Sequence, residues 1–119
     1  MLFRSLFRTV AAYVPPPPGV RPPMLWGTEA YLRDLFGEGI ASLELRERTF
    51  TFRFASAEEL VAFFRRWYGP TLKAFAALEG DARDELERDL VELARRFDRI
   101  RGDAIAIPSA YTEAVAITR

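Results

Sequence analysis

The sequence predicts an α/β fold, because helical and strand-like patterns of apolar residues follow one another along the chain. Apolar residues recur every three or four positions in residues 1–14, 28–36 and 57–99, which is typical of amphipathic helices. They alternate with polar residues in 41–54 and again in 104–118, which indicates strands. The chain has 119 residues, 50% of them hydrophobic, and this is enough to bury one small core. We therefore expect two to three strands and four to five helices.

Composition excludes several classes of function. The 17 basic and 17 acidic residues balance, which removes the electrostatic case for a nucleic-acid partner. Cysteine and histidine are absent, so disulfides, thiol chemistry and a histidine metal site are excluded, and we assign no metal ligand. No apolar run approaches the ~20 residues of a membrane-spanning helix, so no membrane is expected as a partner. Arg4 and Arg8 interrupt the apolar N-terminal pattern, which argues against a secretory signal and favours a cytoplasmic protein.

The first third of the chain combines a helix with a proline-rich connection. Val14 precedes Pro15 and is pushed out of the α region, so the helix of residues 1–14 ends there. Four consecutive prolines then favour an extended polyproline II segment within the connection of residues 15–27. Thr28 is placed to cap the helix of residues 28–36, and Gly37 to end it.

The strand region 41–54 changes phase partway along. Leu43 and Leu45 are apolar at odd positions, whereas Phe52 and Phe54 are apolar at even positions. Successive side chains of a strand point to opposite faces, so one regular strand cannot accommodate this change. We expect a bulge or break at 46–48, with one strand over 41–46 and a second extended piece over 49–54.

Three helical pieces are expected between this region and the last strand. Ser56 and Glu59 form an S-x-x-E capping box at the start of the first piece, and Gly69-Pro70 separates it from the second. Gly80 ends the second piece, and Asp81 is expected to cap the third, whose charged side is interpreted as a solvated surface. The final strand region, 104–118, is expected to be kinked or interrupted at Pro108.

The order of these pieces resembles the C-terminal half of class I S-adenosylmethionine-dependent methyltransferases, in particular the bacterial small-molecule branch. The similarity covers nearly the whole chain, although none of the matching segments is a cofactor motif. Five short segments carry the resemblance: Pro15-Pro16-Pro17-Pro18-Gly19, Leu25-Trp26-Gly27-Thr28-Glu29, Ser56-Ala57-Glu58-Glu59, Tyr68-Gly69-Pro70-Thr71 and Pro108-Ser109-Ala110-Tyr111.

The resemblance implies that residues 1–119 form a single partial domain, the C-terminal portion of a Rossmann-like sheet. Residues 57–99 would then be a helical lid inserted between the last two strands. The family's glycine-rich loop and its ribose-binding acid have no counterpart here, as though the chain began after the family's fifth strand. We therefore assign no cofactor-binding residue and do not expect S-adenosylmethionine to bind this chain alone. A missing N-terminal half or self-association is the expected protein partner.

Three aromatic residues are candidates for lining a substrate pocket: Trp26, Trp67 and Tyr68. Each lies beside a glycine at a predicted helix end, where a large ring with a polar edge suits a small organic acceptor. Core packing is the alternative role for these rings. Glu29 as a base and Tyr111 as a hydrogen-bond donor are weaker candidates, because a helix-terminal acid and a strand tyrosine commonly have structural roles. No catalytic residue is assigned.

Three functional hypotheses follow. The first is the substrate-side portion of a methyltransferase acting on a small organic molecule, inactive alone. The second is an autonomous α+β module that binds a small ligand in an aromatic pocket, or a protein through the proline-rich segment 15–23. The third is a structural or interaction remnant that pairs with itself.

Overall fold

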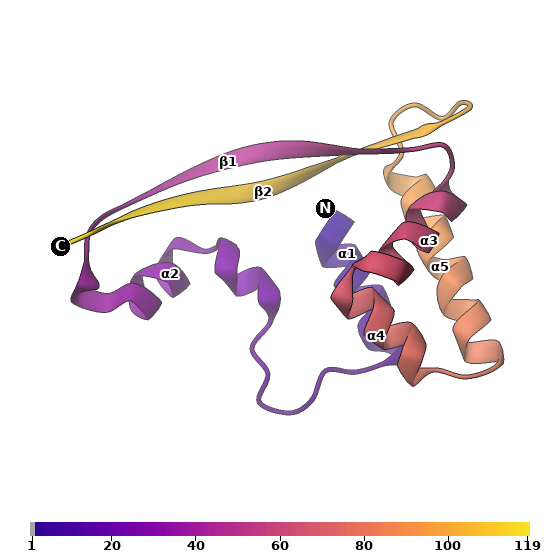
Figure 1. Cartoon of the computed structure of the whole chain (residues 1–119), viewed down its shortest axis with the longest axis horizontal. Coiled ribbons are helices and arrows are strands. Elements are labelled where there is room, and N and C mark those ends of the chain that lie inside the picture. Colours follow the sequence, from indigo (N-terminus) through magenta and orange to yellow (C-terminus); the bar gives the residue numbers. More distant parts are fainter. Residues whose placement is uncertain (1) are drawn as a thin grey trace. The chain divides into compact units, whose positions relative to one another are not determined.

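The computed structural model describes residues 2–119 as an α/β protein with five α-helices and a two-stranded antiparallel sheet (Figure 1). The expected numbers of helices and strands are confirmed. Three of the helices lie in sequence between the two strands. In chain order the elements are α1 (Leu2–Tyr13), the 3-10 helix η1 (Pro23–Gly27), α2 (Glu29–Phe36), the 3-10 helix η2 (Gly37–Gly39), β1 (Ile40–Phe54), α3 (Ala57–Trp67), α4 (Gly69–Ala77), α5 (Asp81–Phe97) and β2 (Ile105–Thr118).

The chain divides into two compact units. The first unit contains the chain up to Pro17 together with Thr51–Ser109, and so includes α1, α3, α4 and α5. The second unit contains Pro18–Phe50 and Ala110–Arg119, and so includes α2 and most of β1 and β2. The division falls within both strands.

Four helices build the core of the first unit. Helix α5 packs against α1 and α3, and α4 packs against α3 and α1. The apolar stripes of these helices meet at side chains that are almost completely buried. This burial supplies most of the stability of such short helices. The most deeply buried large side chains are Leu86, Leu93, Ile107 and Val61. An aromatic layer joins the strand end to this core, with the ring of Phe52 centred 5.5 Å from Phe64 and 5.9 Å from Phe3.

The helix boundaries follow the sequence, but two of the expected caps differ. Ser56 caps α3 as predicted, its Oγ accepting a hydrogen bond from the backbone N–H of Glu59 at 3.1 Å. Thr28 occupies the N-cap position of α2, yet its hydroxyl donates to the carbonyl of Leu25 at 2.7 Å instead of accepting from the helix. Asp81 is the first residue of α5, and the N-cap position belongs to Gly80, with φ of 57°. At that position glycine is favoured because it has no Cβ.

The expected separation of residues 41–54 into two strands was wrong, since β1 is continuous from Ile40 to Phe54. The change of phase is nevertheless visible in the burial of the side chains. Leu43 and Leu45 are half-buried in the second unit, whereas Phe52 and Phe54 pack on the core of the first. The phase changes near the point where the strand leaves one unit and enters the other, so each unit selects its own set of inward positions.

The last strand also continues through Pro108, where an interruption was expected. A sheet of two strands leaves each strand one edge without ladder bonds, and proline fits in a strand at such an edge. The hydrogen bonds at the two ends of β2 identify this edge. The N–H of Arg119 points toward β1 and donates to the carbonyl of Gly39 at 3.3 Å, whereas Ala106 bonds to the loop before β2. The backbone N–H and C=O groups of successive residues alternate in direction along a strand. Those of the even-numbered residues, Pro108 included, therefore point away from β1.

The proline-rich connection is shorter and less uniform than the expected rod. Residues 15–17 have no regular secondary structure, and a turn follows at Pro18-Gly19. Gly19 adopts φ of 85°, a conformation that glycine reaches without steric cost and that redirects the chain. The segment that contains Trp26 is then wound into η1.

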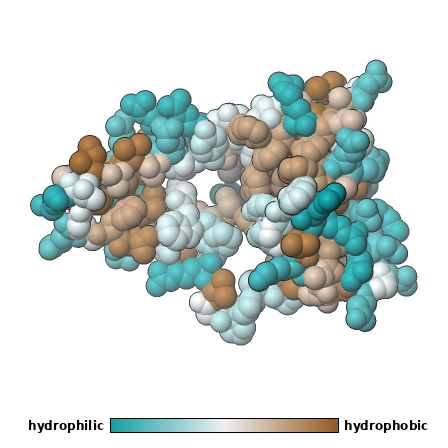
Figure 2. All heavy atoms as spheres, viewed as in Figure 1, coloured by the Kyte–Doolittle hydropathy of each residue, from teal (hydrophilic) through white to brown (hydrophobic). Residues whose placement is uncertain are grey.

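Several large apolar side chains remain at the surface of each unit (Figure 2). Within residues 2–119, no helix combines the length and apolar character needed to cross a bilayer. Large exposed apolar side chains are common where a protein contacts a ligand or another polypeptide.

Candidate functional site

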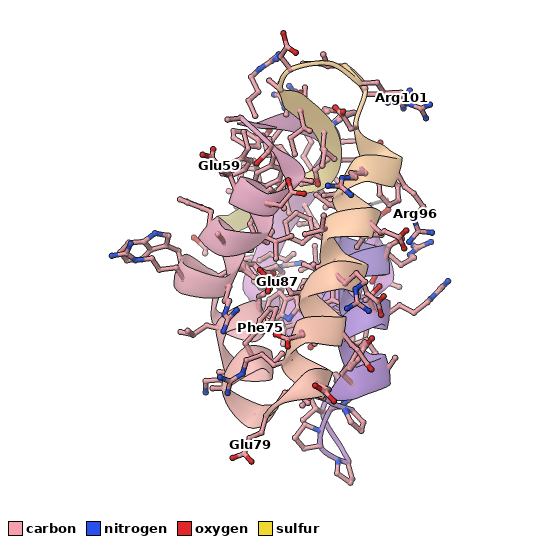
Figure 3. The ribbon with its side chains drawn as sticks, turned by 90° about the vertical axis from the view of Figure 1, so that its right-hand side faces the viewer. Glu59, Phe75, Glu79, Glu87, Arg96 and Arg101 are labelled. Atoms are coloured by element: carbon pink, nitrogen blue, oxygen red, sulfur yellow. The ribbon has the colours of Figure 1, made fainter. Side chains whose placement is uncertain are left out.

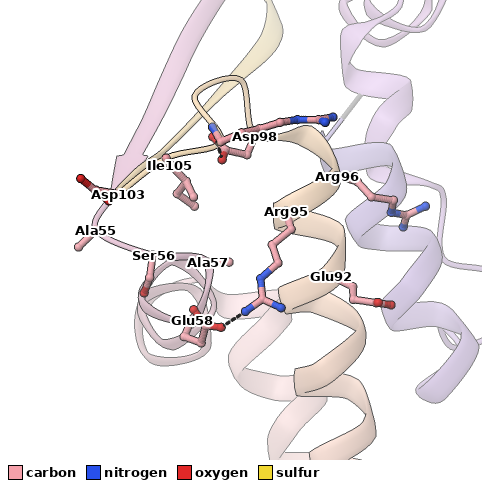
Figure 4. A pocket seen from close by; sticks show the side chains of 12 residues that line it. Ala55, Ser56, Ala57, Glu58, Glu92, Arg95, Arg96, Asp98, Asp103 and Ile105 are labelled. Atoms are coloured by element: carbon pink, nitrogen blue, oxygen red, sulfur yellow. Dashed lines mark hydrogen bonds and ion pairs between the residues drawn. The ribbon is translucent and has the colours of Figure 1, made fainter.

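The first unit contains an open groove of about 940 Å³ between the start of α3 and the end of α5 (Figure 4). Its volume is in the range of pockets that bind small organic molecules. The groove is lined by charged, polar and small side chains: Ala55, Ser56, Ala57, Glu58, Glu92, Arg95, Arg96, Asp98, Arg101, Gly102, Asp103 and Ile105.

One wall of the groove is the N-terminus of α3. The chain leaves β1 at Phe54 and turns into the helix at Ser56, whose extended backbone and side-chain hydrogen bond fix the first turn. Glu58 and Glu59 lie in this turn, where a carboxylate is stabilised by the positive end of the helix dipole. The segment Ser56–Glu59, one of those that carry the methyltransferase resemblance, is therefore also the segment that shapes this wall.

The opposite wall comes from the last turns of α5. Arg95 crosses the groove and forms an ion pair with Glu58 (Figure 4). Both side chains remain more than half exposed, at 61% and 57%, so the pair contributes little to stability. Arg96 extends from the outward side of α5, and Arg101 follows in the next loop (Figure 3). Within residues 2–119, Arg95 is the groove arginine that forms an ion pair, and Arg96 and Arg101 form none.

A loop organised by Asp98 closes one end of the groove. The buried carboxylate of Asp98 accepts hydrogen bonds from the backbone N–H groups of Ile100, Arg101 and Ala106, each at 3.0 Å. The hydrogen bond from Ala106 is the main cause that lowers the pKa of Asp98, opposed by burial of the carboxylate. Arg101 is held at φ of 56°, the only positive φ of a non-glycine residue among residues 2–119. These contacts hold the backbone beside the groove in a defined conformation.

The groove is suited to binding a polar molecule. It combines guanidinium groups with carboxylates on opposite walls, which can orient a ligand that carries both polar and charged groups. Residues 2–119 contain no cluster of three or more acidic side chains placed to hold a metal ion.

Trp67 and Tyr68 occupy the junction of α3 and α4, away from the lining of this groove. Trp67 is 65% exposed, with the guanidinium carbon of Arg66 at 5.0 Å from its ring centroid. Tyr68 instead packs inward, its ring 5.4 Å from that of Phe64 and 5.8 Å from that of Phe3. Burial raises the pKa of Tyr68. These two rings are adjacent in sequence but differ in solvent exposure, and of the two only Trp67 offers a large exposed surface.

Trp26 belongs to the second unit, where it is 57% exposed on η1. Its ring lies edge-on to Tyr31 with centroids 5.6 Å apart, and the guanidinium of Arg21 lies 5.8 Å from the Tyr31 ring. The next residue, Gly27, accepts a hydrogen bond from the hydroxyl of Thr112 in β2 at 3.3 Å. Thr112 directly follows the segment Pro108-Ser109-Ala110-Tyr111, so this contact joins one segment of the resemblance to the residue that comes after another.

The weaker candidates also have defined surroundings. The carboxylate of Glu29 pairs with Arg33 at 2.9 Å across one turn of α2, which is the contact expected of a helix-surface acid. Tyr111 is 50% exposed on β2. Neither residue lines the groove of the first unit.

Sequence reasoning did not identify Arg95, Arg96, Asp98 or Arg101 as groove residues. Arg95 and Arg96 belong to the helix side that was interpreted as a solvated surface, and Asp98 and Arg101 were given no role. One signal was available: four charged residues stand within the six residues from Asp98 to Asp103, between a helix and a strand. The first of these residues, Asp98, was informative, because an aspartate in a turn commonly accepts a hydrogen bond from the backbone two residues on.

Comparison with known proteins finds relatives of greater length. The chain is 35% identical over 99 residues to the uncharacterized protein Rv1405c of Mycobacterium tuberculosis and to Mb1440c of Mycobacterium bovis. It is 26% identical over 99 residues to Rv1403c of M. tuberculosis. Each match covers 80% of this chain but only 36% of the relative, so the chain spans about a third of the length of these curated relatives. No protein-family model and no solved structure matches the chain.

Proposed function

We propose that this chain is the substrate-side, C-terminal portion of an S-adenosylmethionine-dependent methyltransferase of the cytoplasm, with a Rossmann-like sheet, that acts on a small organic acceptor. The observation that carries the proposal is the placement of the Ser56–Glu59 segment. This segment of the resemblance forms a wall of a groove large enough for a small molecule. The Gly27–Thr112 contact supports it, because it joins a second segment of the resemblance to the residue that directly follows a third.

The residues present do not fit the cofactor. Adenosyl cofactors on such sheets are held by a glycine-rich turn directly after a strand. None of the glycines follows β1 or β2 directly, and those with positive φ, Gly19, Gly37 and Gly80, lie in the proline connection or at helix ends. We assign cofactor binding to a further portion, and nearly two thirds of the length of each relative lies outside the match.

In this proposal the chain contributes positioning. Methyl transfer from a sulfonium is an in-line displacement, and holding the acceptor in line is the main contribution that a protein can make. Arg96 and Arg101 would bind an anionic or polar part of the acceptor. The loop around Asp98 would keep Arg101 in place, since its backbone is fixed by that carboxylate.

The test uses calorimetry with S-adenosylhomocysteine on full-length Rv1405c and on this chain. We expect the relative to bind it and this chain alone to show no binding. Absence of binding by the folded relative would overturn the methyltransferase assignment. Micromolar binding by this chain alone would overturn the proposed division between a cofactor portion and a substrate portion.

A second candidate is an autonomous binding module. The exposure of Trp26 and Trp67, at 57% and 65%, favours it, because large exposed rings are common in recognition surfaces. This candidate predicts a monomer that unfolds cooperatively and whose tryptophan fluorescence changes on adding a small ligand or a partner peptide. If the fluorescence change is lost in Trp26→Phe or in Trp67→Phe, the replaced tryptophan is the ring that contacts the ligand or peptide.

A further inference from the structure

The groove between α3 and α5 carries charges of both signs. Three arginines and four acidic residues are among the side chains that line it. Which of these seven groups already have partners within the protein determines the charge that a ligand of the groove should carry.

Contacts within the first unit satisfy three of the seven groups. Arg95 and Glu58 form an ion pair with each other across the groove. The buried carboxylate of Asp98 accepts three backbone hydrogen bonds, which stabilise its negative charge. A ligand gains little from these three groups, because it would first have to displace the partner that each already has.

The four remaining groups are two cations and two anions. Helix α5 contributes Glu92 and Arg96, and the loop before β2 contributes Arg101 and Asp103. All four residues are exposed, and within residues 2–119 none of them forms an ion pair. The ligand that complements them carries both signs of charge and is neutral overall, because a purely anionic or purely cationic molecule would be repelled by one of the two pairs.

The positions of these groups suit a ligand whose two charges lie close together. Glu92 precedes Arg96 by one turn, and both side chains leave the same side of α5 (Figure 4), with Cβ atoms about 5–6 Å apart. An amine and a carboxylate attached to the same carbon can therefore contact both residues. The backbone of Arg101 is fixed by its hydrogen bond to Asp98, so less ordering of the loop is required when a ligand binds.

We propose that this groove binds a small zwitterion with a protonated amine and a carboxylate, the charge pattern of a free amino acid. The carboxylate of the ligand contacts the guanidinium groups of Arg96 and Arg101, which can bind it through paired N–H donors. The amine contacts Glu92, and Asp103 adds a second negative charge in the same groove. This inference rests on the proposed function, because it names the chemical class of the methyl acceptor.

The test compares three probes that differ only in charge: L-leucine, N-acetyl-L-leucine and L-leucinamide. Leucine is chosen because Ala57 and Ile105 give the groove an apolar part that its side chain can contact. Each probe is added to this chain at constant ionic strength and at pH about 6, where a free amine is protonated. Amide chemical shifts in nuclear magnetic resonance spectra report both the folded state and binding. We expect shifts at Glu92, Arg96 and Arg101, and a dissociation constant for L-leucine at least about threefold lower than for either derivative, which lacks one charge.

Substitutions assign each end of the ligand. Arg96→Gln should weaken L-leucine binding about threefold and leave L-leucinamide unchanged, because the amide has no carboxylate. Glu92→Gln should weaken L-leucine by a similar factor and should not weaken N-acetyl-L-leucine, which has no charged amine. Arg99→Gln and Glu59→Gln are the matched controls, since both residues are exposed and lie outside the lining of the groove. Neither control should change the affinity for any probe.

Two results would overturn the inference: no shift of the groove amides with L-leucine, or binding of a singly charged derivative as tight as that of L-leucine. Failure of the proposed function is separate. Binding of L-leucine in the groove, without binding of S-adenosylhomocysteine by Rv1405c, would retain the zwitterion site and overturn only the methyltransferase assignment. The reverse result would retain that assignment and overturn only the zwitterion site.

Discussion

The carboxylate Oδ1 of Asp98 accepts a hydrogen bond from the backbone N–H of Ala106 at 3.0 Å, and so joins the end of α5 to the start of β2. The same oxygen accepts from Ile100, and Oδ2 accepts from Arg101. One buried side chain therefore satisfies three backbone donors that have no place in a helix or in the ladder with β1. The loop beside the groove depends on this residue.

Replacement of Asp98 should destabilise the first unit. Asp98→Ala leaves three backbone N–H groups without their acceptor, and a buried donor without a partner is costly. We expect a clear fall in the urea midpoint of unfolding, and faster hydrogen exchange at Ile100, Arg101 and Ala106. Asp103→Ala, an exposed acid in the same loop, is the matched control and should change neither. Equal effects of the two variants would contradict this role.

The same carboxylate should make stability depend on acid pH. The pKa of Asp98 is lowered in the folded protein from its ordinary value of 3.8, so its contribution is present above pH 3.8. That contribution is lost as the pH falls through the lowered pKa. The free energy of unfolding should therefore decline more steeply below pH 4 in the natural protein than in Asp98→Asn. Parallel pH profiles for the two proteins would show that another carboxylate is responsible.

Tyr13 should titrate at an unusually high pH. Its hydroxyl donates to the carboxylate of Asp89, and this hydrogen bond is the main cause that raises the pKa of Tyr13 to about 12. The folded value lies above the ordinary value of 10.0, so the stabilisation is complete below pH 10 and is lost as pH rises toward 12. Absorbance at 295 nm should show a late-titrating tyrosinate that Tyr13→Phe removes. Asp89→Asn should shift it toward pH 10, and a titration unchanged by Asp89→Asn would contradict the assignment.

The N-cap residues Ser56 and Thr28 should contribute differently to the free energy of unfolding. Ser56→Ala removes the acceptor of the Glu59 N–H and should cost about 1 kcal/mol, the usual loss for such a cap. Thr28→Ala removes a hydroxyl that donates to Leu25 and makes no cap bond, so its effect on α2 should be smaller. Urea unfolding of the first unit and the helical circular dichroism of each variant give the comparison. A larger loss for Thr28→Ala would indicate that its hydroxyl caps α2 in solution.

The core of the first unit should be sensitive at α5. Leu86 has no exposed surface, and Leu86→Ala should cost roughly 2–5 kcal/mol through lost burial and the cavity left behind. Leu72→Ala on α4 is the matched control, because that leucine is 47% exposed and should cost much less. The two free energies of unfolding, measured in urea, test whether α5 is central to the packing.

Local features of the sequence were sufficient for most element positions. The spacing of apolar residues located all five helices, Ser56 located the start of α3, and Gly37 located the end of α2. The change of phase in β1 was also present in the sequence, but its interpretation as two strands was wrong, because the continuity of a strand depends on its partner. The same dependence explains β2, which continues through Pro108 because that residue faces away from β1.

The positions of the helices and strands could be predicted from the amino-acid sequence, since periodicity and caps act within a few residues of one another. The groove depends on the packing of distant segments, because Arg95 contacts Glu58 across 37 positions of the chain. The outward edge of β2 depends on it as well, because Asp98 binds Ala106 across a loop. It also separated Trp67 from Tyr68, turning one ring to solvent and the other into the core. Contacts between distant residues depend on how the elements pack, and no local pattern of residues encodes that packing.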